Sequence, residues 1–184
     1  NARQGKKARI VAKMNSLCDP MIMNALYDAS KAGVKIELIV RGICCIKAGV
    51  PGLSDNISVR SIVGNYLEHS RIFYFYNDGF EDIYMGSADW MPRNLDKRVE
   101  ITFPVEDPEL KKKIKNILKI QLEDTLKAHI MQPDGSYAKQ DLRGKAKLDS
   151  QMYFVKLAQE SQKPVKEEDN DRVFIPVESH GDNE

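Results

Sequence analysis

The order of hydrophobic and polar residues predicts alternating strands and helices in the first part of the chain. Residues 8–14 have a β-branched apolar centre that is typical of a short strand. Asp19 in a capping position and Pro20 in the first turn then begin a helix, which is expected to end before Gly33. Residues 34–41 predict a second strand. Strand, helix and strand in this order form a βαβ unit, whose two strands lie parallel.

Further strand-like segments indicate a larger sheet. The Asn77-Asp78-Gly79 turn suits a hairpin between two of these segments, and a hairpin joins antiparallel strands. A sheet that contains both the hairpin and the βαβ unit has to be mixed, so the predicted fold class is α/β. The segments are residues 57–63, 71–76, 82–86 and 98–103.

Two amphipathic helices are predicted in the second half of the chain. Asp107 and Pro108 repeat the cap and the proline, and leucines and isoleucines recur at helical spacing as far as Leu126. This long helix should lie against the sheet, with His129 at its end. Residues 131–148 are rich in turn formers, and residues 149–159 form the second amphipathic stretch.

The composition allows one domain with an appendage. Of 184 residues, 42% are hydrophobic and 30% are charged, which excludes wholesale disorder, a collagen-like repeat and a disulfide-rich miniature fold. We expect residues 1–162 to form the domain. Residues 163–184, which include His180, are mainly acidic and are expected to form a flexible tail. The first residue is not Met and a strand follows almost at once, which indicates a piece of a longer protein.

Charge and cysteine content narrow the function classes further. Lys and Arg number 28 and Asp and Glu 27, so no long-range field attracts nucleic acid and any anion site has to be local. Three cysteines without a CxxC pair indicate reduced thiols in the cytoplasm. No stretch approaches the roughly 18–20 apolar residues of a membrane span. We therefore expect a cytoplasmic protein without a transmembrane segment, and leave association with a membrane surface open.

Two polar residues at strand ends are candidates for anion binding. Arg41 closes an apolar strand and precedes Gly42, at the kind of strand end where α/β sheets bind ligands. From position alone, pairing of Arg41 with a neighbouring carboxylate is an equally good reading. His69 and Arg71 precede an apolar run and partly match the HxK pattern of phospholipase D-like enzymes, although the cation is not Lys and Tyr76 stands where that pattern has Asp. A histidine in this place is also commonly structural.

A third group of polar residues follows the next strand. Ser87 and Asn94 resemble the GSxxxxxN continuation of the same pattern, in which small residues let a backbone approach phosphate. Arg93, Lys97 and Arg98 then concentrate positive charge before a predicted strand. Taken alone, such charges more often belong to a solvated loop, here neutralised by Asp96 and Glu100. Three cation-bearing strand ends in one small sheet nevertheless favour phosphate as the ligand.

Four runs of residues are distinctive when taken together, at positions 40–45, 56–64, 67–71 and 87–100. Together they resemble the carboxy-terminal catalytic domain of the polyphosphate kinase family. The resemblance covers about residues 8–140 and implies a phospholipase D-like mixed sheet flanked by helices. The chain would correspond to the second of two related catalytic domains in that family.

The resemblance implies a phosphotransferase. Members of this family transfer the terminal phosphoryl group of ATP reversibly to inorganic polyphosphate, with Mg²⁺ and through a phosphohistidine. The phosphorylated histidine and the Mg²⁺ ligands belong to the first catalytic domain, so we expect no metal site in this chain and little activity from it alone. The implied partners are ATP or ADP, polyphosphate, the remaining domains of the enzyme and further copies in a homo-oligomer.

The resemblance also assigns site residues. His69 matches the second catalytic-site histidine, while Arg41 and Arg98 match arginines that face the phosphates. Secondary contacts are expected from Arg71, Ser87, Arg93 and Asn94.

Two alternatives remain. A phospholipase D-like phosphodiesterase or nuclease needs two half-sites and would require a homodimer, and a non-enzymatic module would bind polyanions, with nucleic acid a weak target.

Overall fold

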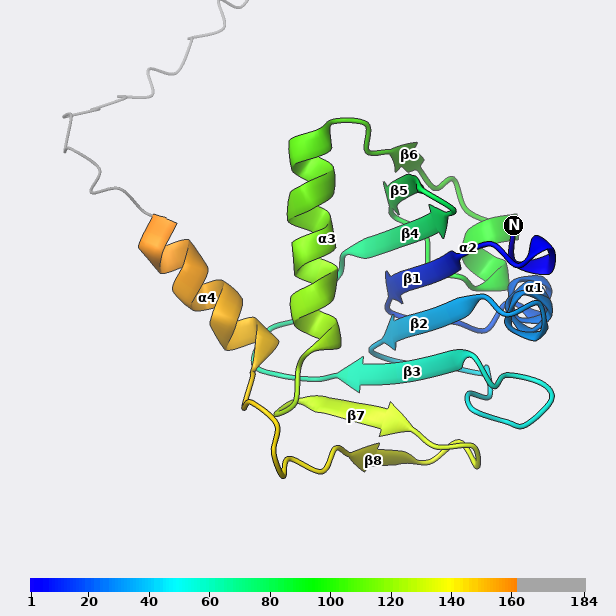
Figure 1. The fold of residues 1–184 in the computed structure, drawn as a ribbon. Helices are drawn as coiled ribbons and strands as arrows, with labels where there is room; N and C mark the ends of the chain where they lie inside the picture. The colour runs from blue at the N-terminus through cyan, green and yellow to red at the C-terminus, as the bar shows by residue number, and fades with distance from the viewer. Residues whose placement is uncertain (162–184) are drawn as a thin grey trace, which may run out of the picture.

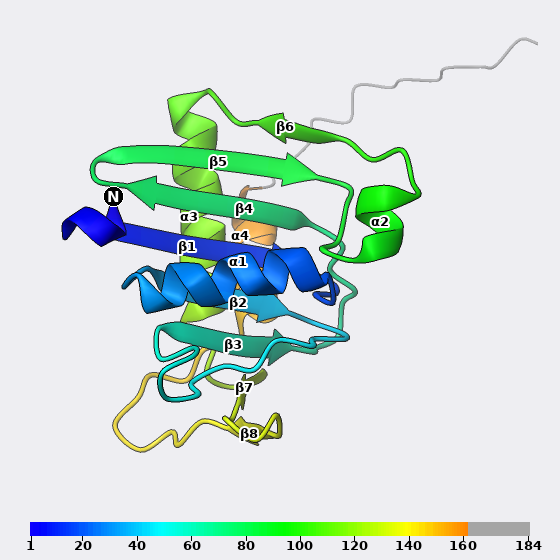
Figure 2. The ribbon, with the colours of Figure 1, turned by 90° about the vertical axis from the view of Figure 1, so that its right-hand side faces the viewer.

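The structure, a computed structural model, describes residues 1–161 and contains one eight-stranded sheet with helices on both faces. The strand order is β6-β5-β4-β1-β2-β3-β7-β8. Helix α1 covers one face and α3 the other (Figures 1 and 2). The expected acidic tail at 163–184, with His180, lies outside the described residues.

The predicted βαβ unit is confirmed. Strand β1 (Ala8–Met14) leads into α1 (Pro20–Lys31), where the Asp19 carboxylate accepts a hydrogen bond from the amide of Ile22 at 2.9 Å. Strand β2 (Lys35–Val40) returns parallel to β1, and β3 (Ile57–Ile62) lies parallel to β2. The carboxyl ends of β1, β2 and β3 therefore reach the same edge of the sheet.

The predicted hairpin is confirmed as well, and it makes the sheet mixed. Strands β4 (Arg71–Asn77) and β5 (Phe80–Gly86) are joined by Asp78 and Gly79, which have φ values of 51° and 104°. Two positive φ angles define the turn type that matches the twist of a two-residue hairpin. Strand β4 lies antiparallel to β1, so the hairpin extends the sheet on the side away from β2.

The strand expected at 98–103 is shorter and later than predicted. Strand β6 (Thr102–Pro104) pairs only with the end of β5, where Gly86 lies opposite Thr102. Strand β5 ends at Gly86, so residues 98–101 have no neighbouring strand to pair with. They follow the short helix α2 (Pro92–Asp96) as a loop.

The long helix is also shorter than predicted. Helix α3 (Pro108–Leu122) begins at the expected cap, the Asp107 carboxylate, but ends before Leu126. The buried carboxylate of Asp124 accepts hydrogen bonds from the amides of Lys127 and Ala128, which turns the chain into strand β7 (Ala128–Met131). The placement of His129 at a helix end was therefore wrong, because it lies on β7 opposite Ser61 of β3.

Two elements complete the described chain. Within the turn-rich segment 131–148, a short strand β8 (Tyr137–Lys139) pairs with β7. Helix α4 (Ser150–Ser161) coincides closely with the predicted second amphipathic stretch. A short 3₁₀ turn at Ala2–Gln4 precedes β1.

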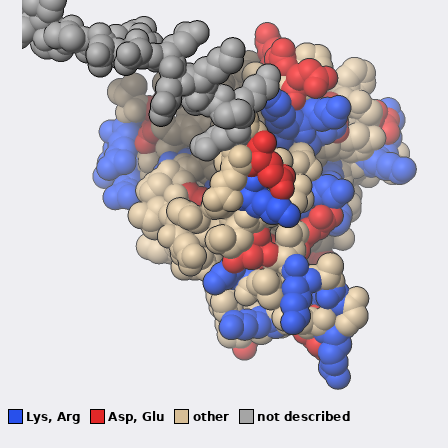
Figure 3. Space-filling model, turned by 90° about the vertical axis from the view of Figure 1, so that its left-hand side faces the viewer, with Lys and Arg blue, Asp and Glu red and all other residues tan. Residues whose placement is uncertain are grey.

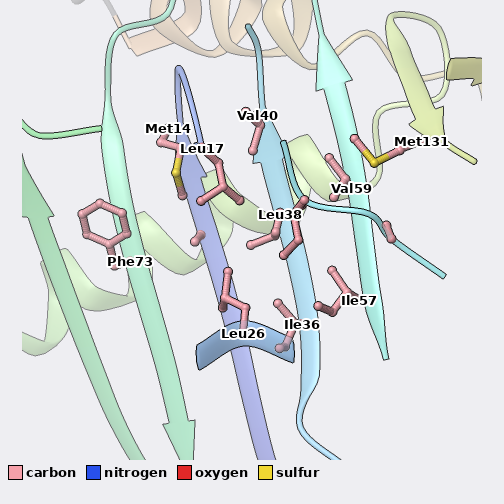
Figure 4. Packing of buried hydrophobic residues seen from close by; sticks show 13 residues of the cluster. Met14, Leu17, Leu26, Ile36, Leu38, Val40, Ile57, Val59, Phe73 and Met131 are labelled. Atoms are coloured by element: carbon pink, nitrogen blue, oxygen red, sulfur yellow. The ribbon is translucent and has the colours of Figure 1, made fainter. Parts of the chain in front are cut away.

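Apolar layers on both faces hold the sheet in place. On one face, side chains of β1, β2 and β3 pack around Leu26 of α1 (Figure 4). On the other face, Ile114 and Leu118 of α3 pack with Val11 and Ile39. Burial of apolar surface drives this packing, and it fixes the strand ends from which the candidate residues emerge.

The outer face formed by α3 and α4 carries interleaved charges. Lys and Arg lie beside Asp and Glu there, together with a continuous uncharged area (Figure 3). This surface therefore does not present a field of one sign, in accord with the net charge of +1. No helix within residues 1–161 is long and apolar enough to cross a membrane.

Candidate functional site

The candidate residues Arg41, His69 and Arg98 lie at one edge of the sheet. Arg41 directly follows β2, whose last residue pairs with the last residue of β1. His69 shortly precedes β4, which starts at that edge because it runs antiparallel to β1. Arg98 belongs to the loop that joins α2 to β6, beyond the carboxyl end of β5. We call this edge, at the right in Figure 2, the phosphate edge, after the ligand that the sequence predicts for it.

The backbone and Nε of Arg41 are held by the protein, while its two terminal nitrogens, the tip of the side chain, are available. Its Nε donates a hydrogen bond to Oδ1 of Asn15 at 3.1 Å, and its carbonyl accepts one from the Ser61 hydroxyl at 3.0 Å. Within residues 1–161 the two terminal nitrogens of Arg41 have no hydrogen-bond or ion-pair partner. A guanidinium in this state can present a planar fork to a phosphate.

Arg71 is engaged inside the protein. Its Nε and Nη2 donate to the two carboxylate oxygens of Asp89 at 3.1 and 3.3 Å, and its Nη1 donates to the carbonyl oxygen of His69 at 2.6 Å. Asp89 is only 6% exposed. The side chain of Arg71 therefore supports the backbone beside His69, and all three of its nitrogens are occupied.

A buried lysine holds the residues on either side of His69. Lys13 is 4% exposed, and its Nζ donates to the hydroxyl and the carbonyl of Ser70 at 2.9 and 3.2 Å. It also forms an ion pair with Glu68 at 3.3 Å. Burial lowers the pKa of Lys13, and the carboxylate of Glu68 opposes that shift. The segment that carries His69 is thus held by Lys13, while His69 itself is exposed.

Ser87 and Asn94 hold Glu100 in the structure. The Ser87 hydroxyl donates to one carboxylate oxygen of Glu100, and Nδ2 of Asn94 donates to the other at 2.6 Å. These two hydrogen bonds, that of Ser87 first, lower the pKa of Glu100. Asn94 is buried, and its Oδ1 has no partner within the described residues.

Gly86 has a structural use at the same strand end. A Cβ built on it would lie 2.6 Å from the carbonyl oxygen of Ile101, so only glycine admits the chain entering β6 at that point. The group that lies closest to this glycine is therefore the backbone of Ile101, directly before β6.

Arg93 and Arg98 are exposed cations on the phosphate edge. Within residues 1–161, no hydrogen bond joins Arg98 to Arg41 or His69, so what the three residues share is their position at one edge of the sheet. Arg98 does lie close enough to Glu100 to lower the pKa of that carboxylate slightly.

The three cysteines lie close together, in the segments that follow β1 and β2. Cys44 pairs with Leu17 in an isolated parallel bridge, which brings the 44–45 segment beside Cys18. All three thiols are free. Burial raises the pKa of the Cys44 thiol from 9.0 to about 11.

The raised pKa of Cys44 predicts a loss of stability in alkali. Between pH 9 and about 11 the unfolded chain releases this proton while the folded chain keeps it, so the free energy of unfolding falls as the pH rises through that interval. Urea unfolding of the chain at successive pH values measures the slope. Cys44→Ala should flatten the slope in this interval, and an unchanged slope in the variant would contradict the assignment.

Sequence reasoning missed three residues that organise the site. Asn15, Lys13 and Asp89 each hold a candidate residue or its neighbour. Asp89 lies two residues after Ser87, within the same run, so the sequence did offer a signal for it. Lys13 lies inside an apolar strand, and only its pairing with a distant part of the chain shows why it is buried.

The described residues do not assemble a metal centre. Across residues 1–161, no group of three or more His, Cys, Asp or Glu side chains lies close enough to hold a metal ion.

The chain is similar in sequence to known polyphosphate kinases. The polyphosphate kinase of Lactiplantibacillus plantarum is 52% identical over 162 residues, which are 88% of this chain and 23% of that protein. Polyphosphate kinase 1 of Chlorobaculum tepidum is 55% identical over 156 residues, or 84% of this chain and 22% of that protein. The chain thus spans less than a quarter of the length of these relatives.

Solved structures extend the comparison. The crystal structure of polyphosphate kinase from Porphyromonas gingivalis matches with a TM-score of 0.82 and 41% identity, over 88% of this chain and 25% of that one. Nuc, a phospholipase D family member from Salmonella typhimurium, matches with a TM-score of 0.50 and 17% identity over 76% of this chain and 87% of that one, which confirms the expected phospholipase D-like fold. Residues 1–151 match the family described as polyphosphate kinase C-terminal domain 2. The chain therefore belongs to the polyphosphate kinase family.

Proposed function

We propose that this chain forms the phosphate-binding half of a polyphosphate kinase active site. The enzyme would transfer the terminal phosphoryl group of ATP reversibly to inorganic polyphosphate. The observation that carries the proposal is the arrangement at the phosphate edge of this family member. The terminal nitrogens of Arg41 are free there, and the backbone of His69 is held by Arg71.

The arginines would act mainly by electrostatics. Phosphoryl transfer spreads negative charge over the oxygens of the transferred group and requires the attacking and leaving oxygens to lie in line. Arg41 and Arg98, on separate loops of one edge, would clamp successive phosphates and offset that charge. Arg93 lies on the same edge and adds positive charge for the polyanion. Arg71, Ser87 and Asn94 would contribute through the residues they hold.

His69 would work opposite a phosphorylated histidine that another domain supplies. An imidazole in that position can donate a hydrogen bond to the transferred phosphoryl group or a proton to the leaving phosphate. Because Lys13 and Arg71 fix the backbone on both sides of His69, the ring would start from a defined position.

Exposed apolar side chains around the phosphate edge support docking of other domains. Val99 is fully exposed, and several large apolar side chains lie on neighbouring loops. We propose that the remaining three quarters of the enzyme supply the domain that covers them, and that the enzyme self-associates. The apolar side chains are Ile43, Val63, Leu67, Val99 and Ile101.

The Mg²⁺ ion would be bound by residues outside those described. Since no cluster of metal-ligating side chains lies within residues 1–161, the described residues do not fit a magnesium site, and no step proposed here passes through the ion. The site of action would be the cytoplasm.

The isolated chain should bind polyphosphate without synthesising it. Arg41→Ala or Arg98→Ala should each weaken binding about tenfold or more, because a charge-assisted hydrogen bond to phosphate is lost. Calorimetry with polyphosphate, ATP and single-stranded DNA across a salt series measures this. Arg143→Ala is the matched control, because Arg143 is exposed and pairs with Asp141 near β8.

Three results would contradict the proposal. A preference for DNA with steep salt dependence would favour a general polyanion-binding module, and hydrolysis of DNA by a dimer of the chain would favour a nuclease. Full polyphosphate synthesis by the chain alone would contradict the assignment of the phosphohistidine to another domain.

A further inference from the structure

A continuous chain of hydrogen bonds links Arg41 to the backbone of His69. Arg41 donates to the side-chain oxygen of Asn15. The backbone amide of Asn15 donates in turn to Oδ1 of Asp89 at 2.8 Å. Asp89 pairs with Arg71, which donates to the carbonyl oxygen of His69. We call Asn15, Asp89 and Arg71 the brace.

The geometry points to a role for the brace in the reaction: we propose that Asn15 and Asp89 are positioning residues that hold Arg41 and His69 in one frame at the phosphate edge. This inference rests on the proposed function. Neither residue is proposed to touch the phosphates.

The centre of the brace is a largely buried ion pair that several hydrogen bonds hold in place. The carboxylate of Asp89 accepts from two nitrogens of one guanidinium and from a backbone amide, which fixes both of its oxygens. A guanidinium and a carboxylate joined in this two-point way have little freedom to rotate. Loss of either partner would leave a buried charge without compensation.

The outer end of the brace acts on Arg41 alone. Within residues 1–161, the only hydrogen bond of the Asn15 side chain is the one that it accepts from Arg41. This contact uses Nε and leaves the two terminal nitrogens free to bind a phosphate. An arginine that is already ordered loses less conformational entropy when it binds, so both affinity and alignment gain.

Asn15→Ala tests the inference with least risk to the fold. At the aligned position of a complete polyphosphate kinase, it should lower kcat/KM about tenfold, since one hydrogen bond that orients Arg41 is lost. Asn24→Ala, in an exposed part of α1, is the matched control and should leave kcat/KM unchanged. Thermal unfolding of both variants should match that of the parent protein.

A double-mutant cycle separates positioning from a general structural effect. If Asn15 acts through Arg41, Asn15→Ala should cause no further loss of kcat/KM in an Arg41→Ala background. The inference is overturned if Asn15→Ala lowers kcat/KM equally in both backgrounds, or does not lower it in the parent protein. If Arg41→Ala itself leaves the kinetics unchanged, the proposed function fails instead, so the two failures are distinguishable.

Asp89→Asn tests the centre of the brace. It keeps the size of the side chain but removes the charge that holds Arg71, and should lower kcat/KM by more than Asn15→Ala. A folded Asp89→Asn enzyme with parental kinetics would also overturn the inference. If this variant does not fold, the Asn15→Ala cycle decides the question.

Discussion

Replacing Arg41 by alanine should lower kcat/KM of a complete polyphosphate kinase by about 100-fold while leaving the fold intact. Charge develops on the transferred phosphoryl group, and the free tip of Arg41 is the preorganised donor available to offset it. The side chain is only half-buried and contributes little to the core. Steady-state kinetics in both directions, with thermal unfolding beside them, measure the two effects separately.

Arg3→Ala is the matched control for this experiment. Arg3 lies in the 3₁₀ turn before β1, at the opposite edge of the sheet, and is exposed. It removes the same charge from the protein, so a comparable loss in Arg3→Ala would trace the effect to net charge. Unchanged kinetics in Arg41→Ala would remove Arg41 from the site.

Replacing Asp124 by alanine should destabilise the chain by about 3–5 kcal/mol. Asp124 is fully buried, and its carboxylate accepts hydrogen bonds from the amides of Lys127, Ala128 and Ser150 and from the Ser150 hydroxyl. Alanine leaves these donors without partners in a place that water reaches poorly. Urea unfolding of the chain measures the loss.

Two further variants make this prediction specific. Asp124→Asn keeps an acceptor oxygen and should lose less stability than Asp124→Ala. Asp141→Ala removes an exposed carboxylate and should leave the free energy of unfolding nearly unchanged. Equal stability of Asp124→Ala and Asp141→Ala would show that the buried hydrogen bonds contribute nothing.

Elements with local signals were predictable from the sequence. Helix α1 begins where Asp19 caps it and Pro20 follows, and both signals act within a few residues of each other. The β4–β5 hairpin likewise depends on two turn residues with positive φ. In these places short-range chemistry and the final fold agree.

Elements that depend on distant partners were not predictable in the same way. Strand β6 begins only where β5 offers a partner, so the charged residues before Thr102 stay outside the sheet. Helix α3 ends early because a buried carboxylate at Asp124 binds amides of the next strand and of α4. Strand β8 has just three residues and exists through its pairing with β7.

In the candidate site, too, some residues could be placed from local signals while others depend on distant partners. Arg41 and His69 could be placed at one edge, because strand ends are visible in the sequence. The residues that hold them could not, since Lys13 meets Ser70, and Asn15 meets Asp89, only when strands distant in the chain lie side by side.

The shielding of the Arg71–Asp89 pair has a consequence for ionic strength. Small ions gather around exposed Arg98 and reduce its pull on a polyanion, whereas they scarcely reach a pair enclosed by protein. Rising salt would therefore weaken the capture of the polymer before it disturbs the alignment of the reacting groups. In a crowded, salty cell interior, how much substrate is held and how well it is aligned would be set by different parts of the molecule.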